Sequence, residues 1–279
     1  MGLCLAFVAT ACESVVDDAA AISTSEVSDA AEDDLCESVD ATGEGRVVAI
    51  YRVENGSLGS LCQGEANDLL VETWRQLAEV SPASELAAIS ALAGFDGPDS
   101  DTAAFTAPLF DYNEEFVVAV NLDIAGDDVA ESQLTMVHEL THVFSLEQDQ
   151  IDFDADEAGC DTFYNGSGCF LADSYVVAWI DQFWSDEQLA SLPSDGSIDE
   201  PGGDARCTID PMFLGGYAAS HPEEDLAESF AAYVFTIDVD AQVSDKMVFF
   251  DGYPELAAFR AKATSAGETD LPNNFGACG

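Results

Sequence analysis

Basic residues are scarce in this sequence. Its 279 residues include 55 Asp and Glu but only 7 Lys and Arg, which gives a formal net charge of −48. Such a chain should repel nucleic acid and anionic membrane surfaces, so neither is expected as a partner. The acids are spread along the whole length, which favours a solvated acidic shell, as in halophilic proteins, over a binding face for basic substrates. Because like charges need screening, stability is expected to depend on salt.

Long apolar segments are lacking as well, and nothing beyond the N-terminus could span a bilayer. Leu3 to Ala11 is apolar, and Ala9-Thr10-Ala11-Cys12 looks like the lipobox of a bacterial lipoprotein signal, although no basic residues precede it. We expect residues 1–12 to be a signal and residues 13–35, which are acidic and without aromatic residues, to be a disordered linker. Lipidation of Cys12 would attach the chain to the membrane. An ordinary frayed N-terminus is the alternative.

No CxxC pair occurs, which argues against a thiolate zinc site and favours disulfides. Six cysteines remain once Cys4 and Cys12 are set aside. The short separation of Cys160 and Cys169 makes a local bridge the best supported pairing, and the others would then be Cys36 with Cys62 and Cys207 with Cys278. Bridges imply an extracytoplasmic chain that is lipid-anchored at the cell surface or secreted.

Histidine is nearly absent too, yet two of the three histidines stand in one motif, His138-Glu139-Leu140-Thr141-His142. On a helix the positions i and i+4 share a face, so both imidazoles can reach one ion. Glu139 lies about 100° round the helix, near enough to contact a metal-bound water. The apolar flanks fit an interior helix that starts near Asp127 or Asp128. This spacing predicts a catalytic Zn²⁺ site; a merely buried histidine pair is the alternative.

A catalytic zinc ion needs a third protein ligand. Ser145 and Gln148 stand where a metzincin would continue its motif, so that pattern is absent. Among the downstream carboxylates, Glu228 is the best candidate because it follows the first turn of an amphipathic helix and has apolar neighbours. Glu224, expected in an exposed first turn, and Asp225 are candidates for orienting a ligand histidine.

The two motifs HELTH and EDLAESFA together resemble the gluzincin metallopeptidases, in particular the group that includes the anthrax lethal factor catalytic domain. In that family a glutamate in an "xAExF" helix completes the zinc site, and Glu228 matches it. The family also places a polar side chain, typically tyrosine, one or two helical turns before that glutamate to assist the oxyanion. Here His221 stands seven residues before Glu228 and Tyr217 lies further upstream, so this chain departs from the pattern.

The expected activity is therefore zinc-dependent endopeptidase cleavage of a peptide or protein substrate. Zinc held by His138, His142 and Glu228 would activate water, and Glu139 would act as the base. His221 or Tyr217 would stabilise the oxyanion. The strand expected just before the motif helix could bind substrate by β-augmentation, if it is a sheet edge. We expect a monomer.

The coarse pattern predicts an α+β fold in residues 36–279, a zincin-like domain with a small sheet beside a mainly helical body. Strands are expected at 46–53, before an Asn55-Gly56 turn, and at 116–122. Residues 194–207 should form a loop. Helices are expected at 66–80, 84–92, 174–184, 222–237, 240–249 and 254–266.

Two other functions remain open. One is a catalytically silent surface lipoprotein whose zinc site only braces the fold, although a structural site has no use for a base at Glu139. The other is an acidic cation-binding surface protein, in which Asp152, Asp154 and Asp156 resemble alternating calcium ligands without the glycine and glutamate of an EF-hand.

Overall fold

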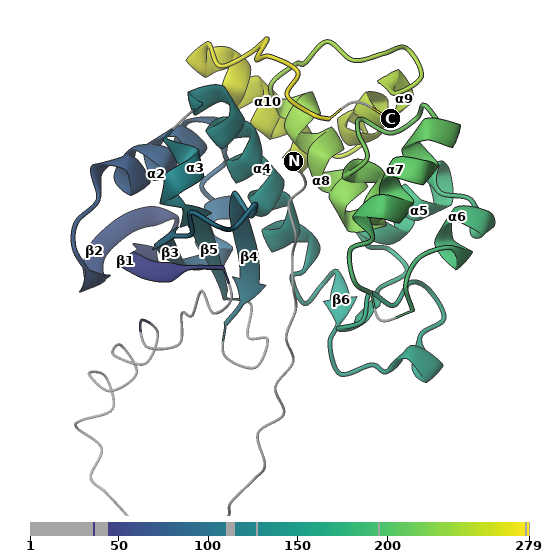
Figure 1. Ribbon diagram of the computed structural model, residues 1–279, viewed down its shortest axis with the longest axis horizontal. Helices are drawn as coiled ribbons and strands as arrows, with labels where there is room; N and C mark the ends of the chain where they lie inside the picture. The colour runs from purple at the N-terminus through teal and green to yellow at the C-terminus, as the bar shows by residue number, and fades with distance from the viewer. Residues whose placement is uncertain are drawn as a thin grey trace, which may run out of the picture.

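The computed structural model describes residues 36, 44–109, 115–126, 128–194, 196–276 and 278. The expected signal with Cys12 and the expected linker at 13–35 lie outside the described residues. Figure 1 shows a sheet at one end of the molecule, a long helix along it, and a helical body beyond. The α+β class expected from the sequence is confirmed.

The main sheet has five strands in the order β2-β1-β3-β5-β4. Only the β3–β5 pair is parallel; the β1–β2, β1–β3 and β4–β5 pairs are antiparallel. The strands are β1 (Arg46–Glu54), β2 (Ser57–Gly64), β3 (Ile89–Asp96), β4 (Ala104–Pro108) and β5 (Phe116–Asn121). The expected β1 and β5 are confirmed. Asn55 and Gly56 have φ values of 51° and 73°, as a type I′ hairpin turn requires.

The expected helix at 84–92 is wrong beyond its first residues. Only a short 3₁₀ turn, η1 (Glu85–Ala88), forms there, and Ile89 begins the central strand β3. This strand is buried on both faces, so its sequence ISALAGFD shows no alternation of apolar and polar residues. The missing alternation explains why periodicity did not reveal it.

Helices α2 (Asp68–Val80), α3 (Leu122–Ala125) and α4 (Val129–Ser145) lie with the sheet. Asp128 caps α4 by accepting hydrogen bonds from two backbone amides of its first turn, so the motif helix starts where the sequence predicts. Beyond α4 the chain forms the helical body and a two-stranded ribbon. Its elements are β6 (Ile151–Asp152), η2 (Glu157–Gly159), β7 (Cys169–Phe170), α5 (Tyr175–Phe183), α6 (Asp186–Ala190), α7 (Glu200–Ile209), η3 (Ala218–Ser220), α8 (Pro222–Val234), α9 (Ser244–Asp251) and α10 (Pro254–Ala266).

Helix α7 replaces most of the loop expected at 194–207. Asp199 caps it, and Pro201 stands in its first turn, which offsets the poor helix propensity of Gly202 and Gly203. A Cβ added at Gly203 would come within 2.3 Å of the Gly216 carbonyl oxygen. Glycine therefore allows α7 to lie directly against the turn that leads into α8.

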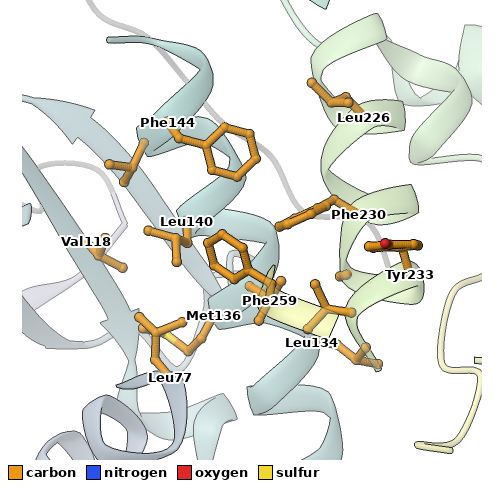
Figure 2. Close-up of a cluster of buried hydrophobic side chains, with 14 of the residues drawn as sticks. Leu77, Val118, Leu134, Met136, Leu140, Phe144, Leu226, Phe230, Tyr233 and Phe259 are labelled. Atoms are coloured by element: carbon orange, nitrogen blue, oxygen red, sulfur yellow. The ribbon is translucent and has the colours of Figure 1, made fainter. Parts of the chain in front are cut away.

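The core joins the two halves of the molecule through α4 and α8. Figure 2 shows Leu140 and Phe144 of α4 facing Leu226 and Phe230 of α8, with Phe259 between them. The rings of Phe144 and Phe230 lie 5.3 Å apart in an edge-to-face arrangement. All four of these α4 and α8 side chains are buried. This apolar contact fixes the spacing of the two helices.

All three expected disulfides are confirmed: Cys36–Cys62, Cys160–Cys169 and Cys207–Cys278. Disulfides of this number indicate an oxidising compartment outside the cytoplasm. Within the described residues, no helix is long and apolar enough to cross a membrane.

Candidate metal centre

The motif helix α4 presents His138 and His142 on one face. Their Nε2 atoms are 3.1 Å apart, and the rings meet nearly edge to face with centroids at 4.9 Å. Both side chains are buried, because the last three turns of α4 run through the core. Two imidazole nitrogens therefore converge on one point inside the protein.

Glu224, from the first turn of α8, supplies the carboxylate at this point. Its Oε2 lies 3.1 Å from Nε2 of His138 and 3.5 Å from Nε2 of His142. Despite this proximity the oxygen is buried and makes no hydrogen bond. Within the described residues, His138, His142 and Glu224 are the group whose ligand atoms all approach one another closely enough to hold a metal ion.

The donor set fits zinc. A tetrahedral ion with bonds of about 2.0–2.1 Å separates its ligand atoms by about 3.3 Å, close to the three distances observed. Two neutral imidazoles and one carboxylate are a ligand set used by catalytic zinc sites, which leave a further position for water. The buried oxygen of Glu224 without a hydrogen bond is accounted for by such an ion.

The carboxylate in the group is thus Glu224 and not Glu228, which corrects the sequence prediction. Glu228 lies one helical turn further along α8, where it is also buried and its Oε2 has no hydrogen-bond partner. Burial, together with the charges of Glu224 and Asp225, raises the pKa of Glu228 to about 8. The prediction failed because it assumed an exposed first turn, whereas Glu224 at the start of α8 is only 3% exposed.

Glu139 is completely buried next to the imidazoles, and neither of its carboxylate oxygens has a hydrogen-bond partner. Burial raises its pKa, and the two histidines oppose that rise. A carboxyl group with a raised pKa and free oxygens can exchange a proton with a nearby water. The hydroxyl of Thr106 in β4 donates to the Glu139 carbonyl oxygen at 3.0 Å and so attaches β4 to the motif helix.

Tyr217 and His221, the two candidates for the oxyanion donor, have different surroundings. The Tyr217 hydroxyl is buried without a hydrogen-bond partner, and its ring lies 6.0 Å from that of His138. Burial raises its pKa well above the ordinary value, so the hydroxyl keeps its proton. His221 instead places its Nδ1 3.3 Å from Glu223, and burial lowers its pKa to about 4. Of the two, Tyr217 has the free proton donor.

With Glu224 as the candidate ligand, the separation between Tyr217 and the ligand glutamate is shorter than with Glu228. Tyr217 stands seven residues before Glu224, which is the one-to-two-turn separation that the resembled family shows between its tyrosine and its ligand glutamate. The tyrosine spacing was thus a signal for Glu224 that the sequence analysis missed. Helical pattern could not separate the two glutamates, because both belong to the same face of α8; Glu228 was preferred for its apolar neighbours and its match to the family motif.

Asp225, expected to orient a ligand histidine, contacts other groups. It accepts hydrogen bonds from Lys246 and from the indole nitrogens of Trp179 and Trp184. A second polar contact was also not anticipated: Asn165, inside the Cys160–Cys169 loop, donates to both carboxylate oxygens of Glu223 at 3.2 Å.

The strand that could bind substrate is β4 and not β5. Strand β5 lies between β3 and β4 and is therefore interior, so the condition on which residues 116–122 could bind substrate, a place at the sheet edge, is not met. In the described sheet β4 is the edge strand on that side, and its Thr106 contacts α4 at the residue that carries the candidate base.

No protein-family model and no curated protein matches the sequence. A comparison with solved structures finds a crystal structure described as "a putative zinc-binding metallo-peptidase" from Bacteroides caccae, at 16% sequence identity. The match covers 74% of this chain and 70% of that chain, with a TM-score of 0.30.

Proposed function

We propose that the protein is an extracytoplasmic zinc-dependent endopeptidase. The observation that carries the proposal is the convergence of His138, His142 and Glu224 on one point, with the unpartnered carboxylate of Glu139 beside them. Three ligands with an open position, next to a candidate base, are what metal-assisted hydrolysis requires. The gluzincin resemblance of the two motifs agrees with this function.

In the proposed mechanism, two side chains act beside the metal ligands. His138, His142 and Glu224 would hold a zinc ion, which would supply polarisation of the scissile carbonyl and a bound water of lowered pKa. Glu139 accepts the proton of the attacking water and passes it to the leaving amine. The Tyr217 hydroxyl donates a hydrogen bond to the oxygen that becomes negatively charged.

The substrate is a peptide or protein segment in extended conformation. In the described sheet, β4 pairs with β5 on one side only, and the other edge can bind a substrate backbone by β-augmentation. The hydrogen bond from Thr106 to the Glu139 carbonyl would keep a strand bound there in register with the catalytic residues. Pro108 ends β4, so pairing is limited to a few residues.

The two other functions of the sequence analysis have less support. A silent, structural zinc site does not account for a buried Glu139 without hydrogen bonds. A cation site at Asp152, Asp154 and Asp156 would need their oxygens to converge, and within the described residues only His138, His142 and Glu224 bring three such ligand atoms together. Attachment through Cys12, the monomeric state, the acidic adaptation to salt and the absence of nucleic-acid partners remain part of the proposal.

The proposal is tested by metal analysis of the purified protein followed by digestion of casein and a peptide library. Stoichiometric zinc and cleavage that a chelator abolishes are expected. Zinc without cleavage of any peptide would support the silent alternative, and absence of zinc would contradict the metal site itself. Labelling with radioactive palmitate in a bacterial host tests the attachment at Cys12, with Cys12→Ser as the control.

A further inference from the structure

The residue next to the candidate ligand Glu224 belongs to a buried polar cluster on the other side of α8. Lys246 of α9 is completely buried, and its Nζ lies 2.6 and 2.8 Å from the two carboxylate oxygens of Asp225. The indole nitrogens of Trp179 and Trp184 donate to Oδ2 of the same carboxylate, at 2.8 and 3.0 Å. One carboxylate thus receives hydrogen bonds from three different side chains.

Within the described residues, Asp225 is the acidic side chain in hydrogen-bond contact with the Lys246 ammonium; the charges of Asp210 and Glu228 act on it from further away. Besides Asp225 it faces aromatic rings, with Nζ 4.4 Å from the centroid of Phe213 and 5.5 Å from that of Trp179. A buried ammonium is stable only with its counter-charge, so separating Lys246 from Asp225 would be costly. Buried ion pairs contribute little net stability compared with apolar residues, and their best attested role is to fix a register.

The position of helix α8 along its own axis decides which of its glutamates faces the two histidines. It carries two buried glutamates, Glu224 and Glu228, one turn apart on the same face. A shift of about one turn, about 5.4 Å, would exchange them at the two imidazoles. The same shift would bring Ser229 to the place of Asp225, because these residues are also four apart. A serine hydroxyl cannot neutralise Lys246.

We propose that Asp225 and Lys246 are positioning residues that select Glu224, rather than Glu228, as the third metal ligand. The inference rests on the proposed function, since it concerns the same zinc site. Neither residue touches the metal or the substrate. They act by holding the first turn of α8 in the one register that satisfies the ammonium.

The test compares Lys246→Met and the apolar double variant Asp225→Leu/Lys246→Met with the wild type. Replacement of a buried ion pair by apolar residues is often tolerated, but the double variant also removes the acceptor of the Trp179 and Trp184 indoles. Urea unfolding of each metal-free variant therefore measures its stability separately from metal binding. Zinc affinity, measured by competition with a chromophoric chelator, should fall about ten- to a hundredfold in both variants. The visible absorption of bound Co²⁺, which reports ligand number and geometry, should change as well.

Lys262→Met is the matched control. Lys262, the other lysine of the chain, binds the carbonyl oxygens of Ala78 and Ser81 at the end of α2. Its loss should lower stability and leave zinc affinity and the Co²⁺ spectrum unchanged. A folded Lys246→Met or double variant with wild-type zinc affinity and spectrum would overturn the inference. A wild type that binds no zinc would overturn the proposed function instead.

A mutant cycle asks the register question directly. In the wild-type background Glu224→Gln should lower zinc affinity strongly and Glu228→Gln should not. In the Asp225→Leu/Lys246→Met background the loss from Glu224→Gln should become smaller and that from Glu228→Gln larger. Identical losses in the two backgrounds would show that the ion pair does not select the ligand.

Discussion

Helices α4 and α8 both carry residues of the candidate metal centre, but they are held in place by different kinds of contact. Around its histidines α4 is lined with buried apolar side chains such as Val137, Leu140 and Val143. Every residue of α8 is buried as well, yet four of them are acidic: Glu223, Glu224, Asp225 and Glu228. Apolar packing sets the distance between helices, whereas specific polar partners set the register of one of them.

Three basic residues contact α8 or the turns that flank it. Lys246 pairs with Asp225, and Arg206 donates to the carbonyl oxygens of Ala219 and Ser220 in the turn before the helix. Arg260 lies over the ring of Tyr233, at 4.8 Å, near the end of the helix. Three of the 7 Lys and Arg thus contact this one helix or the turns that flank it. The others include Arg46 and Arg75, which form exposed ion pairs with Asp96 and with Glu72 and Glu79.

The largest expected effect concerns the acid on α4. Glu139→Gln should keep zinc bound but slow peptide hydrolysis by about 10²–10⁴-fold or more, because only the proton acceptor is lost. Steady-state kinetics with matched metal analysis measures both quantities. Glu131→Gln, in the first turn of the same helix, should behave as the wild type. Turnover retained by Glu139→Gln would contradict the assignment of the base.

Substitutions of the two glutamates Glu224 and Glu228 in α8 should have different effects on zinc affinity. Glu224→Gln removes a ligand and should weaken zinc binding by about a hundredfold or more, whereas Glu228→Gln should change it by less than about threefold. Chelator competition gives the two affinities under one set of conditions. Equal effects of the two substitutions would contradict the assignment of Glu224, rather than Glu228, as the metal ligand.

Substitutions on the apolar sides of α4 and α8 should lower the free energy of unfolding by similar amounts. Leu140 in α4 and Leu226 in α8 are both completely buried, so Leu140→Ala and Leu226→Ala should each lower the free energy of unfolding by about 2–5 kcal/mol. Urea unfolding of the metal-free proteins measures this. A much smaller loss at Leu226 would mean that α8 depends on its polar contacts for stability and not only for register.

The smallest expected effect is a pH dependence of the free energy of unfolding of the metal-free protein. Burial lowers the pKa of His142, but the carboxylate of Glu224 outweighs burial and raises it to about 9. Burial raises the pKa of Glu223 to about 7 and that of Glu228 to about 8. Each of these folded-state pKa values lies above the unfolded value. The stability that protonation of these groups contributes is therefore present at low pH. The contribution of Glu223 is lost as pH rises through 7, that of Glu228 through 8, and that of His142 through 9.

The free energy of unfolding without metal should accordingly fall between pH 6 and pH 9, by on the order of 1–3 kcal/mol. Urea denaturation in the presence of a chelator at the two pH values measures the change. With saturating zinc the dependence should weaken, because the ion takes the place of the His142 proton. A metal-free protein that is equally or more stable at pH 9 would contradict these protonation states.

Sequence pattern predicted the motif helix well because its signals are local. The cap at Asp128, the apolar period and the two histidines at i and i+4 all depend on α4 alone. The hairpin turn at Asn55 and Gly56 is local in the same sense. These features could be predicted without knowledge of the neighbours.

The third ligand could not be derived in this way. Glu224 and Glu228 have the same helical phase, and whether the first turn of α8 is exposed depends on α4, α9 and the turn before it. Strand β3 posed a similar problem, since burial on both faces removed its alternation. Helix α7 was missed because Gly203, read as a loop residue, is required for close packing. In each case a contact distant in sequence decided the outcome.

The disulfide between Cys207 and Cys278 has a consequence for the order in which the site is assembled. The two cysteines are 71 residues apart, and the intervening loop contains Tyr217, Glu224 and Lys246. During synthesis Cys278 emerges only after all of these residues, so the covalent loop around them closes late. His138 and His142 precede this loop in the chain. The proposed peptidase would therefore be inactive while it is still nascent and could not cleave the proteins that synthesise it.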